Sequence, residues 1–322
     1  MKLGVLTILF QDKPIEEALD IIVETGVEMI ELATGGYLSS AHCNPYQLLE
    51  NPRELQKLKD VVKSRNLTIS ALSCHGNPLH PDKKISENHS EVLKTSIKLA
   101  NKLDVPCVNC LSGLPGAYPE DRLIHWICLP FPDDPAPTEA LQWQWEERLI
   151  PFWKDMGHLA HKNNVQIGIE MLPGNLVYNP ETMLALRKAA GPEICVNFDP
   201  SHLYWQGIDI CESIRHLKDC ICHFHAKDAG LAPHNIRLNG LYDQKKLTDE
   251  NNRAWIYRTV GYGHDATHWK EVFSTLRQIG YDSVASIEHE DSLMSALEGF
   301  IKSVAFLKEV MINEKPTAAF WA

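Results

Sequence analysis

The fold is decided by three apolar runs in the second half of the chain, VQIGIEM (165–171), ICVNFD (194–199) and CICHFHA (220–226). Two stretches with helical periodicity, 180–191 and 208–219, separate them. The order strand, helix, strand predicts parallel strands, because parallel neighbours need a connection long enough to hold a helix. This part of the chain is therefore expected to form a parallel sheet covered by helices.

The same alternation extends over the rest of the sequence. Five further apolar runs complete a set of eight: KLGVLTI (2–8), VEMIEL (27–32), LTISALS (67–73), VPCVNCL (105–111) and SVASIEH (283–289). A helical pattern follows each run, and eight such units favour a closed (β/α)8 TIM barrel over an open sheet. We expect an α/β fold with a single barrel domain over residues 1–311 and a C-terminal tail over residues 312–322.

A barrel of this kind usually needs about 250 residues, so part of this 322-residue chain is expected in long loops. Two segments, 112–140 and 229–262, follow the fourth and the seventh run. Both should emerge at the face of the barrel where active sites form, and loops of this length are usually functional. For Trp143 and Trp153, at the end of and after the first segment, we expect simple packing of a helix against the barrel.

The composition excludes several classes of protein. There are 31 Lys and Arg against 42 Asp and Glu, a net charge of −11 with neutral His, which argues against nucleic acid or an anionic membrane as a partner. No apolar run reaches the length of a membrane span, and the N-terminus does not resemble a signal peptide, so a cytoplasmic protein is expected. The nine cysteines fit reduced core thiols, and the CxxC spacing of Cys107 and Cys110 fits a strand better than zinc.

Four polar residues stand at the ends of the last four runs: Glu170, Asp199, His225 and Glu288. In a barrel these strand ends converge on one mouth, so the four side chains should meet in space. A lone carboxylate there is most simply solvated, but four charged groups close together need a compensating cation. Three carboxylates and one imidazole predict one divalent metal ion, with Mn²⁺ as the first choice and Mg²⁺, Co²⁺, Fe²⁺ or Zn²⁺ as alternatives.

Further polar residues near these ends are candidates for substrate binding. His202 follows Asp199 in DPSH, and its alternatives are a fifth ligand or a helix cap. Lys227 could polarise a substrate oxygen or simply pair with Asp228. His75 and Arg258 complete the candidates; Arg258 could hold an anionic substituent or pair with an acid. Asp291 is expected to cap the last helix.

The sequence resembles the xylose-isomerase-like TIM-barrel superfamily, the sugar phosphate isomerase/epimerase group. The phrases that carry the resemblance are IEMLPGN (169–175), NFDPSHLYWQGID (197–209), HFHAKD (223–228), GYGHDATHW (261–269) and SIEHEDSL (286–293). The resemblance implies that Glu170, Asp199, His225 and Glu288 bind the metal, that His202 and Lys227 line the substrate site, and that Glu170 and Glu288 are the catalytic acid and base. It implies proton abstraction next to a carbonyl, through a metal-stabilised enediolate, in a keto sugar or a 3-keto-glycoside.

Alternatives to this function remain open at the level of sequence. Relatives with long loops include lyases that remove an aglycone from a 3-keto-glycoside with a small partner subunit, and a non-catalytic sugar-binding barrel is a third hypothesis. The endonuclease branch of the superfamily is disfavoured, because NCLSG (109–113) lacks its extra histidine. The expected partner is a small carbohydrate, with neither nucleic acid nor membrane, in a chain that acts alone, as a homo-oligomer or with a small subunit.

Overall fold

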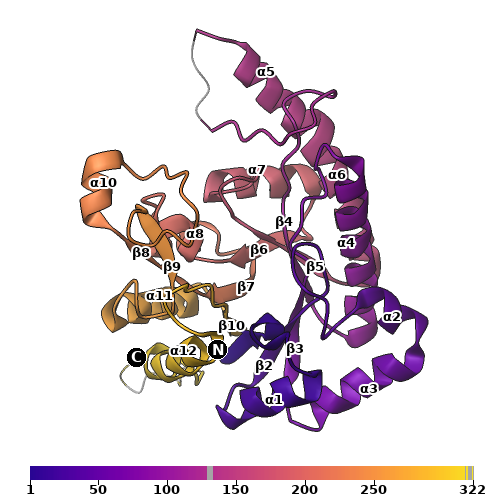
Figure 1. Ribbon diagram of the computed structural model, residues 1–322. Helices are drawn as coiled ribbons and strands as arrows, with labels where there is room; N and C mark the ends of the chain where they lie inside the picture. The colour runs from indigo at the N-terminus through magenta and orange to yellow at the C-terminus, as the bar shows by residue number, and fades with distance from the viewer. Residues whose placement is uncertain (129–132, 316, 318–320, 322) are drawn as a thin grey trace.

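The computed structural model describes residues 1–128, 133–315, 317 and 321. Its centre is a closed barrel of parallel strands in the order β1-β10-β7-β6-β5-β4-β3-β2 (Figure 1). The strands are β1 (Lys2–Leu6), β2 (Met29–Ala33), β3 (Thr68–Ser73), β4 (Cys107–Leu111), β5 (Gln166–Glu170), β6 (Ile194–Phe198), β7 (Ile221–Ala226) and β10 (Val284–Ile287). Each strand lies within one predicted run, except that β2 extends one residue beyond its run, and the predicted (β/α)8 barrel is confirmed.

Helices connect the strands and cover the outside of the barrel (Figure 1). They are α1 (Ile15–Glu24), α2 (Pro45–Glu50), α3 (Pro52–Lys63), α4 (Lys83–Leu103), α5 (Ala136–Trp143), α6 (Ile150–Asn163), α7 (Pro180–Ala190), α8 (Ser201–Tyr204), α9 (Ile210–His216), α10 (Pro233–Asn239), α11 (Ala266–Gln278) and α12 (Ala296–Val310), with a 3₁₀-helix η1 (Thr7–Phe10) and a π-helix η2 (Gln144–Leu149). Short polar side chains start several of them. Asn179, for example, forms a capping box with Thr182 at the start of α7.

The phase of each strand decides which side chains enter the barrel. In β6 and β7, Phe198 and Phe224 are fully buried and stack with ring centroids 5.9 Å apart, and Phe224 also contacts Phe273 of α11, so these rings face the helices. The alternate residues Asn197 and His225 therefore point to the interior, because successive side chains of a strand lie on opposite faces. On such strands the residues that face the helices are apolar, whereas the alternate residues, which face the barrel interior, can be polar.

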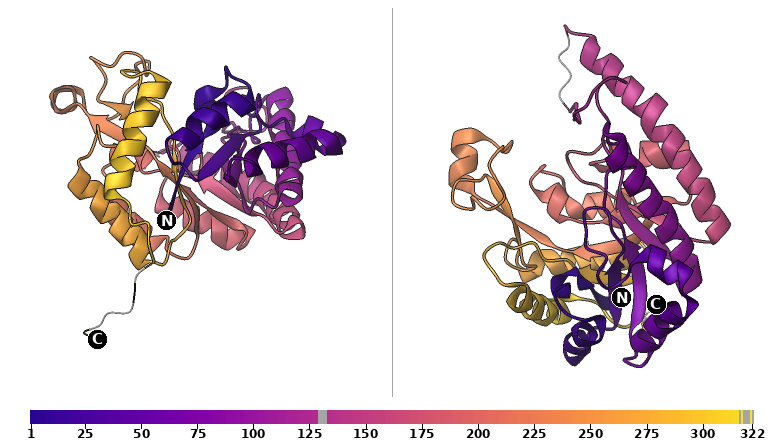
Figure 2. Two further views of the ribbon diagram at one scale, coloured as in Figure 1. Left: turned by 90° about the horizontal axis from the view of Figure 1, so that it is seen from below. Right: turned by 45° about the vertical axis from the view of Figure 1, so that its right-hand side comes forward.

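The two long connections differ from their expected extents. The predicted segment 112–140 ends earlier, because α5 already begins at Ala136 and continues through η2 into α6; its residues 129–132 lie outside the described part. The segment 229–262 contains structure of its own: β8 (Asp228–Leu231) pairs antiparallel with β9 (Trp255–Arg258), and α10 lies between them. Pairing of β8 with β9 satisfies backbone groups that an open loop would leave to solvent. The right-hand view of Figure 2 shows α5 and α10 projecting beyond the barrel.

Packing of tryptophans on the outside of the barrel follows the expectation in part. Trp153 of α6 is fully buried, and its indole N–H donates to the carbonyl oxygen of Ser112 over 3.0 Å. Trp143 of α5 is only half-buried, beneath the guanidinium of Arg148. Among the described residues, no helix is both long and apolar enough to span a bilayer.

Candidate metal centre

Four side chains meet at the carboxyl ends of the adjacent strands β5, β6, β7 and β10. Glu170 ends β5, Asp199 follows β6, His225 lies near the end of β7, and Glu288 follows β10. Since these strands are neighbours in the barrel, one potential ligand atom from each residue lies within 4.8 Å of the others. The structure thus brings together the four side chains singled out in the sequence.

The imidazole of His225 is at the centre of this cluster. Its Nδ1 atom lies 3.2 Å from Oε2 of Glu170 and 3.1 Å from Oε2 of Glu288. Oδ2 of Asp199 is buried and has no well-aligned hydrogen bond within the described part of the chain, although Nε2 of His202 lies 3.2 Å away. Buried carboxylate oxygens that converge without sufficient donors are costly unless a cation compensates them. Three carboxylates and one imidazole fit a hard divalent ion such as Mn²⁺ or Mg²⁺.

Basic side chains hold Glu170 in its ionised form. Burial opposes this ionisation, but the positive charge of His75 and hydrogen bonds from His202, His225 and His75 keep the pKa of Glu170 well below its usual range. Nε2 of His75 lies 3.1 Å from Oε2 of Glu170, and Nε2 of His202 lies 3.0 Å from Oε1. Glu170 is therefore a carboxylate near neutral pH, as a metal ligand or a general base must be.

Lys227 supplies a fixed positive charge on the other side of the cluster. Its Nζ atom lies 3.2 Å from Oε2 of Glu288, 2.5 Å from Glu290 and 3.5 Å from Oδ2 of Asp199. Burial would lower the pKa of Lys227, but Glu288, Glu290 and Asp199 raise it well above its ordinary value. Burial also disfavours the charged form of Asp199, yet His202 and Lys227 lower its pKa to about 2.

Contacts of these side chains exclude two of the alternatives that the sequence left open. Lys227 does not pair with Asp228, because Asp228 instead accepts the backbone N–H groups of Gly261, Gly263 and His264. His202 does not cap a helix: it lies inside α8, and its Nδ1 atom is 3.0 Å from the hydroxyl of Tyr257. His75, His202 and Lys227 therefore all border the cluster.

Arg258 lies apart from these groups. Its Nε atom donates to Oδ2 of Asp291 over 3.1 Å, which is the acid pairing that the sequence allowed. The expectation that Asp291 caps the last helix is wrong, because Ser295 is the N-cap of α12. Asp291 instead accepts the backbone N–H of Thr259 and so ties β9 to the segment after β10.

Glu31 of β2 is an interior residue that the sequence analysis missed. It is fully buried, and its carboxylate accepts hydrogen bonds from Ser73, from Nδ2 of Asn109 at 2.8 Å, from Ser286 at 2.8 Å and from Nε2 of His225 at 3.0 Å. Burial opposes ionisation, but the nearby His225 and His223 lower the pKa of Glu31. The signal was a glutamate inside the apolar run VEMIEL, in the same kind of position as Glu170 in QIGIE.

His223 and Asn197 join this interior network to the cluster of Glu170, Asp199, His225 and Glu288. His223 is buried, and its Nδ1 lies 3.0 Å from Oδ1 of Asn197, whose Nδ2 donates to Oε2 of Glu170 over 2.8 Å. Burial lowers the pKa of His223 to about 4, so its imidazole is neutral at pH 7. The cluster at the mouth therefore rests on a layer of hydrogen-bonded side chains that limits its movement.

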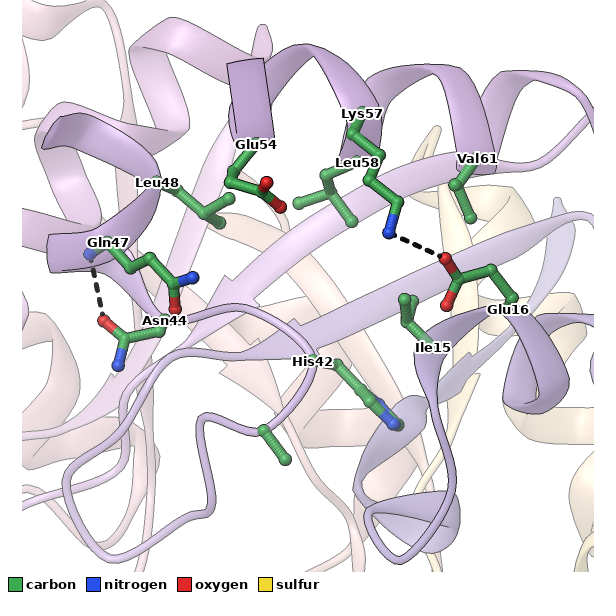
Figure 3. Close-up of a pocket in the computed structure, with 11 residues that line it drawn as sticks. Ile15, Glu16, His42, Asn44, Gln47, Leu48, Glu54, Lys57, Leu58 and Val61 are labelled. Carbon is green, nitrogen blue, oxygen red and sulfur yellow. Dashed lines mark hydrogen bonds and ion pairs between the residues drawn. The ribbon is translucent and has the colours of Figure 1, made fainter. Parts of the chain in front are cut away.

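A surface pocket of about 150 Å³ lies elsewhere, between α1, the segment before α2, and α3 (Figure 3). An ion pair between Lys57 and Glu16 crosses it, and Gln47 donates its backbone N–H to the side chain of Asn44 at the start of α2. The pocket lies outside the barrel, and its lining contains none of the residues of the metal cluster. We assign it to the packing of these helices.

Comparison with known proteins agrees with this architecture. Residues 19–310 match the family model described as xylose isomerase-like TIM barrel. An uncharacterized protein, YfiH of Bacillus subtilis (strain 168), is 37% identical over 312 residues, covering 97% of this chain and 99% of that protein.

Two solved structures share the fold at low sequence identity. One is 3-keto-D-glucoside 4-epimerase from E. coli, with a TM-score of 0.66, 12% identity and coverage of 96% of this chain and 99% of that chain. The other is D-psicose 3-epimerase from Clostridium cellulolyticum H10, with a TM-score of 0.62, 15% identity and coverage of 96% and 98%. The match to the family model over most of the chain, together with the close relative from B. subtilis, shows that this chain belongs to the xylose isomerase-like TIM-barrel family.

Proposed function

We propose that this protein is a divalent-metal-dependent isomerase or epimerase of a keto sugar or a 3-keto-glycoside. The observation that carries the proposal is the placement of two carboxylates, Glu170 and Glu288, at one cation-binding cluster. Their Oε2 atoms lie 3.2 Å and 3.1 Å from Nδ1 of His225, although β6 and β7 separate the strands at whose ends they stand. The fold neighbours include enzymes named as sugar epimerases, which is consistent with this proposal.

A bound divalent cation would polarise the substrate carbonyl and so acidify the adjacent C–H bond. Glu170, ionised and held by its histidine partners, removes that proton, and the electron pair passes to the carbonyl to give an enediolate. In an epimerase Glu288 would start the cycle protonated and donate its proton to the other face of the same carbon, after which proton exchange with solvent resets both carboxyl groups. Lys227 would donate to a substrate oxygen through its ammonium group, and the ring of His202, held between Tyr257 and Glu170, would line the substrate site. His75 holds Glu170 by its hydrogen bond.

The test is proton exchange with solvent. Protein loaded with Mn²⁺ is incubated in D₂O with keto sugars and with 3-keto-glycosides, and deuterium at the carbon next to the ketone is read by NMR. We expect incorporation together with an inverted or isomerised product. Incorporation together with a released aglycone would support a lyase instead, and binding without any exchange would support a sugar-binding barrel.

Replacing each carboxylate by an amide distinguishes its role in proton transfer from its role as a metal ligand. Glu170→Gln and Glu288→Gln keep one oxygen for the metal but lose proton transfer, which is worth about 10² to 10⁴ in rate. We expect each variant to retain metal and to lose turnover by at least about 100-fold. Glu193→Gln is the matched control, because Glu193 pairs with His161 away from the cluster. Wild-type turnover in both site variants would contradict the proposed roles.

A further inference from the structure

A second pocket lies on the same face of the barrel as the metal cluster. It has a volume of about 190 Å³, and its walls include Trp126, Tyr178, Trp205 and Tyr242. These residues come from the connections that follow β4, β5, β6 and β7, respectively. Connections that follow barrel strands emerge at the carboxyl ends of those strands, where Glu170, Asp199 and His225 also lie.

A continuous set of contacts joins this pocket to the metal cluster. The hydroxyl of Tyr257 lies 3.0 Å from His202, the ring of Tyr257 contacts Trp255 at 5.3 Å, and Trp255 stacks on Trp205 with centroids 4.6 Å apart and planes inclined by only 4°. Gln206 also links the two places, since its amide donates to the carbonyl oxygen of His202 over 2.8 Å. A molecule that reacts at the cluster thus has an aromatic surface beside it.

The chemistry of the walls selects an uncharged ring. Two indoles and two phenols line the pocket, and the rings of Trp126 and Tyr178 meet edge to face at 5.4 Å. None of the described residues that line it is Asp, Glu, Lys or Arg. A phosphate or carboxylate would therefore lose its hydration there without gaining a counter-charge, whereas a planar apolar ring gains aromatic contact.

Two wall residues carry hydrogen-bond donors that find no acceptor in the described part of the chain. The indole N–H groups of Trp126 and Trp205 are buried and have no acceptor among the described residues. Buried donors without a partner are rare in native structures, and each calls for an explanation such as a bound group or water. This observation, independent of the shape of the pocket, points to a binding role.

We propose that this pocket is a subsite for the neutral ring attached to the reacting sugar, so that the substrate is a glycoside with a ring aglycone. The inference rests on the proposed function for the location of the reacting sugar. An aromatic aglycone and a second sugar ring share the required feature, a flat face with C–H or π character. The four aromatic rings of the walls, and the lack of charged side chains among the described wall residues, favour the aromatic ring.

The experiment measures binding of glycosides that cannot react. Isothermal titration of the Mn²⁺-loaded protein compares phenyl β-D-glucoside, methyl β-D-glucoside and cellobiose, none of which carries a ketone. We expect the phenyl glucoside to bind about 2- to 12-fold more tightly than the methyl glucoside, the range typical of one aromatic contact. Tighter binding of cellobiose alone would support the subsite and assign its ring to a sugar.

Variants of two wall residues test whether the phenyl ring binds in this pocket. Tyr242→Ala and Trp205→Ala should each reduce the preference for the phenyl glucoside; Tyr242 is 70% exposed, so its loss does not endanger the fold. Tyr118→Ala is the matched control, because Tyr118 is an exposed tyrosine of the β4–α5 connection that is not among the pocket residues. Equal affinities for all three glycosides, no binding of any, or an unchanged preference in both variants would overturn the inference. Because these ligands do not react, failure of the isomerase reaction would leave this result intact.

Discussion

We predict that the hydrogen bond between the carboxylate of Glu31 and Nε2 of His225 controls the affinity of the cluster for a metal ion. Oε2 of Glu31 lies 3.0 Å from Nε2 of His225, while Nδ1 of the same ring faces Glu170 and Glu288. A carboxylate at Nε2 keeps the proton on that nitrogen and leaves Nδ1 free to bind a cation. We therefore expect Glu31 to set the tautomer of the ligand.

Glu31→Gln should reverse the preferred tautomer of His225 with little change in side-chain volume. If the amide oxygen keeps the bond to Asn109, the amide NH₂ faces Nε2 of His225 and pairs only with its unprotonated form, which moves the ring proton to Nδ1. Loss of such a partner typically weakens metal affinity about 10- to 100-fold. Loss of the charge-assisted bond should also lower the free energy of unfolding of the metal-free protein by about 1.5–3 kcal/mol.

Two measurements check this prediction. Titration calorimetry gives the dissociation constant of Mn²⁺, and urea unfolding in the presence of a chelator gives the stability. Glu28→Gln is the matched control, because Glu28 lies just before β2 and its side chain forms an exposed ion pair with Lys2 at 3.4 Å. If folded Glu31→Gln protein binds Mn²⁺ with the wild-type dissociation constant, the tautomer argument is refuted.

The remaining predictions concern the ligands, a loop anchor and the response to pH. Asp199→Ala and His225→Ala should each lower the Mn²⁺ content per chain, and full occupancy of both variants by elemental analysis would contradict the ligand assignment. Asp228→Asn should lower the unfolding free energy by about 3 kcal/mol, because the carboxylate accepts three backbone N–H groups of the segment 261–264; an unchanged urea midpoint would argue against this. Burial lowers the pKa of His223 from 6.5 to about 4. Between these two values the unfolded state binds more protons than the folded state, so the free energy of unfolding falls as the pH decreases from 6.5 towards 4. In chelator, the advantage of wild type over His223→Gln should shrink by about 2 kcal/mol between pH 7 and pH 5, and a constant difference would contradict a neutral buried His223.

The sequence alone determined the βα repeat and the positions of four of the interior polar residues. Apolar runs and helical periodicities are local properties, so the strands could be located to within a few residues. Glu170, Asp199, His225 and Glu288 were detectable because each stands where an apolar run ends. The parallel barrel then places the ends of neighbouring strands together, whatever the details of the loops.

Only the tertiary structure decided the rest of the site. Glu31 and Ser286 are 255 residues apart, and they meet because the closed barrel joins β10 to β1, beside β2. A strand that is buried on both faces lacks the regular alternation of apolar and polar residues of a half-buried strand, so its pattern does not reveal which residues point inward. The pairing of Arg258 with Asp291 and the contact of Tyr257 with His202 depend on how β8 and β9 fold over the mouth. Contacts of this kind are set by chain closure and packing, which no local pattern encodes.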